Sequence, residues 1–151
     1  MGNIIIGTEA VANGVVTRHQ LRRWYRRVYP NVHAPRTSEL TLRDRTVAAW
    51  LWSKRAGVIT GLAAAALHGS RWIDDDVDIE LIYNCTRSPG GIITRNEHIG
   101  SEEWQMLDGL PVATPARTAF DLGRFQRRDH AVAQLDALMR VRPYSLEDPL
   151  M

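Results

Sequence analysis

The sequence of 151 residues has one cysteine, Cys85, and one lysine, Lys54, against eighteen arginines. A single cysteine excludes an internal disulfide and a zinc site built from cysteines. A single lysine excludes the acidic-x-Lys site of restriction-type nucleases, because Trp52 stands two positions before Lys54. No apolar run approaches the roughly 18 to 20 residues that span a bilayer, and the start, MGNIIIGTEA, lacks the features of a signal peptide. We expect a soluble cytoplasmic protein without a membrane partner.

Acidic side chains are missing from residues 11–38, which contain six arginines. The net charge of the chain is only +2, because the basic residues of its first part are offset by acidic residues further along. Residues 1–60 carry ten Arg and Lys against three Asp and Glu, a balance of +7, whereas residues 61–151 carry nine against fourteen, a balance of −5. A basic front half and an acidic rear half predict one face directed at a polyanion.

Two short helices are predicted before residue 25. Residues 8–13 form the first, with Thr8 as N-cap and Gly14 as the left-handed stop. Thr17 and Gln20 have the spacing of a capping box, which predicts a second helix from Arg18 to about Trp24. In this helix Leu21 and Trp24 lie three apart and are expected to face the core, which puts Arg18, Arg22 and Arg23 on or near the outer face. Two short helices joined by a turn that contains glycine are typical of a helix-turn-helix.

A β-hairpin is predicted directly after the second helix. Tyr25–Tyr29 and Val32–Ala34 are rich in aromatic and β-branched residues and flank the turn Pro30–Asn31. Helix, turn, helix and hairpin follow one another in the order of a winged helix. We therefore expect residues 1–38 to form a winged helix-turn-helix, with its second helix in the major groove of double-stranded DNA and the hairpin at the backbone or minor groove.

The predicted DNA-binding residues lie on or beside that second helix and the hairpin. Arginine neutralises phosphates, which releases counterions, and it contacts guanine through two parallel hydrogen bonds. The alternative is a solvated basic face without a ligand. The candidate residues are Thr17, Arg18, His19, Arg22, Arg23, Arg26, Arg27 and Arg36.

Residues 39–151 are expected to form a second domain. The pattern predicts an amphipathic helix over Thr41–Arg55, capped by Thr41, that buries Leu42, Val47, Trp50 and Leu51. It also predicts a helix in GLAAAALHG capped by Thr60. The other predicted elements are strands at 58–59, 77–83, 92–95, 104–107 and 110–113, around the hairpin turn Asp108–Gly109, and helices at 114–125 and 130–141. The predicted fold class is α+β: a winged helix-turn-helix followed by a small mixed α/β domain with a short antiparallel sheet. The tail, RPYSLEDPLM, has no clear structural end, which leaves open a truncation at the C-terminus.

An enzymatic alternative rests on Asp78 and Glu80. Carboxylates that alternate on a strand can hold Mg²⁺, and the preceding HGS at 68–70 is similar to a nucleotidyltransferase signature. The gap from Ser70 to Asp78 is shorter than that family usually shows, and no later strand offers a clear third carboxylate. The competing interpretation is a solvent-facing strand edge with Asp78 and Glu80 on its polar face. We favour a protein without metal, cofactor or catalytic residues.

Two further side chains are ambiguous from the sequence. His68 could be a ligand or a base, but a histidine at the end of a helix more often binds carbonyl oxygens. Trp24 stands beside the arginines and could stack on a base, although core packing is the ordinary role of a tryptophan.

The chain resembles the AbiEi family of abortive-infection antitoxins, and more closely actinobacterial relatives in which the same region precedes a Vsr-like endonuclease domain. The stretches that carry the resemblance are VVTRHQLRR, YRRVYPNVHAP, LRDRTVAAWLWS, GVITGLAAAALHG and GLPVATPARTAFDLGR. They cover most of residues 8–125, and none is a catalytic motif. In the last stretch Arg117 and Asp121 match the family's RT…D segment, and an ion pair within one helix explains them.

The resemblance implies an N-terminal DNA-binding module, repression of the protein's own operon, and a functional link to a nucleotidyltransferase toxin. The Vsr-like endonuclease domain would follow residue 151, so a second hypothesis makes this chain the DNA-recognition part of a nuclease. A nucleotidyltransferase-like enzyme is the third. A homodimer is expected because repressors commonly match a two-fold operator.

Overall fold

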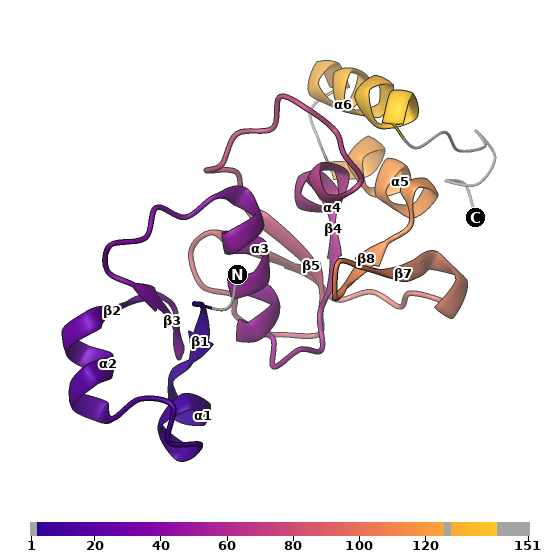
Figure 1. Ribbon diagram of the computed structural model, residues 1–151. Helices are drawn as coiled ribbons and strands as arrows, with labels where there is room; N and C mark the ends of the chain where they lie inside the picture. The colour runs from indigo at the N-terminus through magenta and orange to yellow at the C-terminus, as the bar shows by residue number, and fades with distance from the viewer. Residues whose placement is uncertain (1–2, 126–127, 142–151) are drawn as a thin grey trace.

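The computed structural model describes residues 3–125 and 128–141 and contains two β-sheets and six α-helices in that part of the chain (Figure 1). The helices are α1 (Gly7–Ala12), α2 (Arg18–Trp24), α3 (Leu42–Trp52), α4 (Gly61–Leu67), α5 (Pro115–Phe125) and α6 (Arg128–Val141). The strands are β1 (Ile5–Ile6), β2 (Tyr25–Tyr29), β3 (Val32–Pro35), β4 (Val58–Thr60), β5 (Ile79–Ile82), β6 (Ile92–Arg95), β7 (Trp104–Leu107) and β8 (Leu110–Ala113). The α+β class is confirmed. No described helix is both long and apolar enough to cross a membrane.

The first sheet is antiparallel, in the order β1-β3-β2, and it supports α1 directly. Asn31, in the β2–β3 turn, has a φ of 63° and accepts a hydrogen bond from the backbone N–H of Gly7 at 2.8 Å. Its side-chain Oδ1 accepts from the N–H of Thr8 at 3.0 Å. The prediction that Thr8 caps this helix is therefore wrong: α1 begins at Gly7, and the hairpin turn supplies the acceptors that a capping side chain would have given.

The second sheet has five strands in the order β6-β5-β4-β8-β7. It is mixed, because β5–β6 and β4–β8 are parallel pairs while β4–β5 and β7–β8 are antiparallel. The predicted short antiparallel sheet is thus too simple. The hairpin at its end is confirmed: Asp108 and Gly109 have φ values of 52° and 81°, as a two-residue hairpin turn requires.

Helix α3 lies between the two sheets and contacts strands of both (Figure 1). Its predicted cap is confirmed, since Thr41 Oγ1 accepts from the N–H of Asp44 at 3.2 Å. The helix ends at Trp52 rather than Arg55, because Lys54 and Arg55 have φ values of 58° and 63°, which no α-helix continues. Its predicted buried stripe is only partly right: Leu42 and Leu51 are buried, Val47 and Trp50 only partly, and small residues fill the closest contacts.

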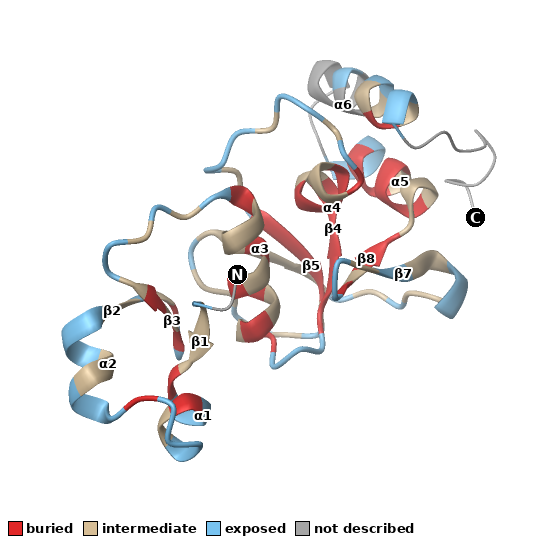
Figure 2. Cartoon of the chain, viewed as in Figure 1, coloured by how far each residue is buried: buried red, intermediate tan, exposed pale blue. Residues whose placement is uncertain are grey.

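The main core joins the parts that precede and follow residue 38. Tyr29 and Val32 of the first sheet belong to the same buried cluster as Ala49 of α3 and Ile59 and Leu81 of the second sheet. A smaller cluster joins α4, α5 and α6. Figure 2 shows the contrast with α2, which is exposed along most of its length and has no buried residue.

Candidate nucleic-acid interface

Helix α2 begins at the predicted capping box. Thr17 Oγ1 accepts a hydrogen bond from the N–H of Gln20 at 3.1 Å, and Gln20 Oε1 accepts from the N–H of Thr17 at 3.0 Å. Both side chains thereby satisfy backbone donors at a helix start that would otherwise lack partners. The capping box fixes where the arginines that follow lie on the helix.

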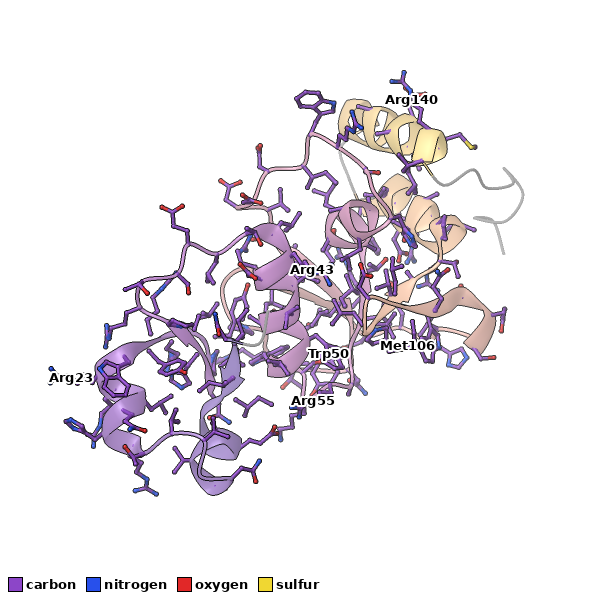
Figure 3. The ribbon with its side chains drawn as sticks, in the orientation of Figure 1. Arg23, Arg43, Trp50, Arg55, Met106 and Arg140 are labelled. Carbon is purple, nitrogen blue, oxygen red and sulfur yellow. The ribbon has the colours of Figure 1, made fainter. Side chains whose placement is uncertain are left out.

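The exposed face of α2 carries four of the predicted residues. Arg18 and Arg22 lie one turn apart, and so do His19 and Arg23; all four are exposed. Figure 3 shows Arg23 on the outer side of α2, directed away from the rest of the molecule. No ion pair with a described carboxylate involves these three arginines. Their charge is available to an anionic partner.

The hairpin separates its two arginines by means of an irregularity. Arg26 pairs with Ala34 and Arg27 with His33, and the register then shifts so that Tyr29 pairs with Val32. Residues two apart on a regular strand share a face, so the extra residue at position 28 lets Arg27 point outward while Tyr29 is buried. Arg26 is half-buried and donates to the carbonyl oxygen of Ser38 at 2.9 Å.

Arg36 is engaged within the protein. Its guanidinium donates from Nε to the carbonyl oxygen of Arg23 at 3.1 Å and from a terminal nitrogen to that of Arg22 at 2.8 Å. These carbonyls belong to the last turn of α2, where a cation also interacts favourably with the helix dipole. The predicted residues therefore fall into two groups. Thr17, Arg26 and Arg36 make hydrogen bonds within the protein, whereas the other five are exposed and form no described ion pair.

His33 and an open hollow beside α2 were not predicted. Burial lowers the pKa of His33, and the positive charge of Arg27 lowers it further, so the imidazole is neutral at pH 7. The sequence could have indicated this contact, because the hairpin pairs His33 with Arg27. The hollow, of about 360 Å³, is lined by Gly7, Thr8, Val11, Ala12, Arg18, Leu21 and Asn31. The expectation that Trp24 faces the core is wrong, because the residue is 54% exposed.

The alternative site at Asp78 and Glu80 has a different arrangement from the one expected. Glu80 is not on a solvent-facing edge: β5 lies inside the sheet, all four of its residues are buried, and the Glu80 carboxylate binds Arg95 at 2.9 Å. Asp78 is exposed and precedes the strand. Among the side chains that the structure describes, no three from His, Cys, Asp or Glu are placed to hold a metal ion together.

The comparison with protein families decides where the chain belongs. The model of the AbiEi antitoxin C-terminal domain matches residues 10–148. The chain belongs to this family. Among curated proteins, no sequence is similar enough to the chain to count as a match. The AbiEi match begins within α1, so α2 and the β2–β3 hairpin lie inside it. It gives no support to the resemblance to proteins with a Vsr-like endonuclease domain.

In this AbiEi domain the predicted Arg117–Asp121 pair is part of a larger ionic cluster. Arg117, 7% exposed, binds Asp121 at 3.2 Å, Glu103 at 2.8 Å and Glu97 at 2.8 Å. Asp121 also accepts a hydrogen bond from Thr60 Oγ1 at 2.5 Å, so Thr60 does not cap α4 as predicted. The hydrogen bond from Arg117 lowers the pKa of Glu103, against the opposing effect of burial. These contacts connect α5 to the segments around it.

His68 in the AbiEi domain binds a carbonyl oxygen, although not one of its own helix. The residue follows α4, is buried, and its Nε2 lies 2.8 Å from the carbonyl oxygen of Ala113 in β8. Cys85 lies in a loop, and its Sγ donates to the carbonyl oxygen of Arg87 at 2.9 Å. The His68 contact joins the end of α4 to β8, whereas the Cys85 contact is local to its loop. The side chain of His130 lies outside the described residues.

Proposed function

We propose that this AbiEi antitoxin domain binds double-stranded DNA through a basic surface formed by Arg18, Arg22 and Arg23 of α2 and Arg27 of the hairpin. The observation that carries the proposal is that these four arginines are exposed and form no ion pair with a described carboxylate. Guanidinium groups in that state bind phosphates with release of counterions. His19 lies on the same surface.

The topology supports a winged helix-turn-helix interpretation of residues 1–38. The order helix, turn, helix, hairpin is present, and β1 adds a third strand beside β3. In this interpretation α2 enters the major groove and Arg27 contacts the backbone beside it. Arg26, Arg36 and Thr17 act indirectly, because their hydrogen bonds hold the hairpin and both ends of α2 in place.

The biological role that we propose is that of an antitoxin that represses its own operon and is linked in function to a nucleotidyltransferase toxin. The family supports the antitoxin assignment, and the basic surface supports the repressor activity. A homodimer would match a two-fold operator. No observation favours the nuclease or nucleotidyltransferase alternatives, because Glu80 is neutralised by Arg95 and the family match gives the endonuclease context no support.

The proposal is tested by a mobility shift with a duplex from the region upstream of the protein's own gene. We expect micromolar or tighter binding by the wild-type chain. The double variant Arg22→Glu, Arg23→Glu loses two charge-assisted contacts of about 1.5 kcal/mol or more each, so we expect at least an approximately hundredfold weaker affinity. An unrelated duplex of equal length separates operator recognition from general affinity for DNA.

The matched control is the double variant Arg71→Glu, Arg87→Glu. Both residues are exposed and lie outside the basic surface, and the change in net charge is the same. We expect this control to bind nearly as the wild type does. Equal losses in the two double variants would attribute the binding to total charge and would remove α2 from the proposal.

A further inference from the structure

Trp72 is the most exposed large apolar side chain of the described residues, at 91%, and its backbone is held in an unfavourable conformation with a φ of 69°. Such a conformation costs on the order of 1–3 kcal/mol and persists only where the surroundings impose it. The loop around it is anchored. Arg45 donates at 2.6 Å to the carbonyl oxygens of Asp75 and Val77, and Asp75 Oδ1 accepts from the N–H of Leu42 at 2.9 Å. A fixed loop thus holds an indole out in water.

The hollow between α1 and α2 has the size and chemistry to accept an indole. Its volume of about 360 Å³ is in the range of pockets that take small organic groups. Val11, Ala12 and Leu21 supply apolar walls, and Arg18 borders the hollow with a guanidinium that can lie against an aromatic face. The side-chain polar atoms of Thr8 and Asn31 in this wall already bind each other at 2.9 Å.

The charges around the two features are complementary. Residues 71–78 contain four aspartates and one arginine, a balance of −3. Three of these carboxylates (Asp74, Asp76 and Asp78) are exposed and form no described ion pair. The hollow opens beside α2, where Arg18 and Arg22 are exposed. An approach of the loop to α2 brings opposite charges together around the apolar contact.

Within one chain the two features lie apart. The loop that carries Trp72 connects α4 to β5 and contacts the N-terminus of α3. Helices α1 and α2 lie on the far side of the first sheet (Figure 1). We propose that Trp72 of one copy inserts into the α1–α2 hollow of a second copy, with Asp74 and Asp76 facing the arginines of α2. Each copy contributes a different surface, so this head-to-tail contact can repeat and extend beyond a dimer.

Sedimentation of the full chain, without DNA and at low salt, measures this association. For the wild type we expect an average mass that rises with concentration from 17.1 kDa to beyond twice that value. Trp72→Ala removes the inserted side chain, and Ala12→Phe fills the hollow; each is expected to weaken association by about tenfold or more. The control Met106→Ala truncates another exposed apolar side chain, 60% exposed on β7, and should associate as the wild type does (Figure 3).

An equimolar mixture of the two weakened variants gives the sharper result. The Trp72→Ala chain keeps an open hollow and the Ala12→Phe chain keeps its Trp72, so the mixture should form a one-to-one pair and stop there. Arg18→Glu, which makes the border of the hollow repel the aspartates, replaces Ala12→Phe if that chain does not fold. The proposal is overturned if the wild type stays at the mass of one chain or if the mixture forms no pairs. It is also overturned if both variants still form a dimer. Because no DNA is present, the outcome is independent of the proposed function.

Discussion

At the scale of single residues, Gly61 and Glu80 constrain each other most tightly. Glu80 is 3% exposed and bound to Arg95 at 2.9 Å. A Cβ on Gly61 would lie 2.0 Å from Glu80 Oε2, and the φ of Gly61 is 64°. The carboxylate cannot move away without leaving Arg95, so any side chain at position 61 breaks a buried ion pair or distorts the start of α4.

We expect Gly61→Ala to lower the free energy of unfolding by about 2 kcal/mol or more, from the left-handed conformation together with the displaced carboxylate. Thermal or urea unfolding measures the change. The control is Gly123→Ala in α5, where a Cβ meets nothing within 4 Å; in a helix interior this substitution should stabilise by roughly 0.5–1 kcal/mol. A loss at position 61 no larger than a few tenths of a kcal/mol would show that Glu80 relocates freely.

At the scale of elements, α2 depends on contacts at its ends. It has seven residues and no buried one, and a helix this short is not stable in isolation. The capping box holds its first turn, and Arg36 holds the carbonyl oxygens of Arg22 and Arg23 in its last turn. The basic surface therefore keeps its shape because residues outside it bind the helix backbone.

Arg36→Ala is expected to lower the free energy of unfolding by about 1 kcal/mol, a modest value because the side chain is exposed. Arg36→Lys should recover less than half of that loss, since one ammonium group does not reproduce the fork that reaches two carbonyl oxygens. Arg27→Ala removes the same charge without a described hydrogen bond and should change stability by less than about 0.5 kcal/mol. Full recovery by lysine would reduce the role of Arg36 to its charge.

Local signals in the sequence predicted the elements well. The capping box at Thr17, the cap at Thr41, the turn at Asp108–Gly109 and the limits of α2 are confirmed, because each depends on residues within one or two turns. The second sheet was predicted less well. Parallel pairs such as β4–β8 join strands that lie far apart in the sequence, and nothing local distinguishes them from antiparallel pairs.

For the candidate site too, the sequence predicted the local features but not the contacts between distant segments. The exposure of Arg18, Arg22 and Arg23 followed from helical periodicity alone. The engagement of Arg36 with α2 did not, because its acceptors lie thirteen and fourteen residues earlier in the chain. Likewise Glu80 is neutralised by Arg95, fifteen residues away. Hydrogen bonds at such separations become visible only once the sheets are assembled.

At the scale of the whole molecule, arginines are abundant, and six of those whose side chains the structure describes are bound to carboxylates. Arg43, Arg55, Arg95, Arg117, Arg124 and Arg140 form ion pairs with carboxylates. Several cations of residues 1–60 are exposed and form no described ion pair. Most of them lie on α2, on the hairpin or directly after it (Arg18, Arg22, Arg23, Arg27 and Arg36), and Lys54 lies apart, after α3. On the function that we propose, this AbiEi domain binds a polyanion through that one surface rather than through its overall charge.

The salt dependence of DNA binding tests that distinction. Each arginine that contacts a phosphate contributes about one to the slope of log K against log salt concentration, so Arg27→Ala should reduce the magnitude of the slope by about 1. Arg55→Ala removes the same charge from a residue that binds Glu9 at 2.8 Å, and the slope should stay within about 0.3 of the wild type, since no phosphate contact is lost. Mobility shifts or fluorescence anisotropy at several salt concentrations supply both slopes. If both variants reduced the slope equally, DNA would respond to the total positive charge of residues 1–60. A paired and an unpaired arginine would then contribute equally to the slope.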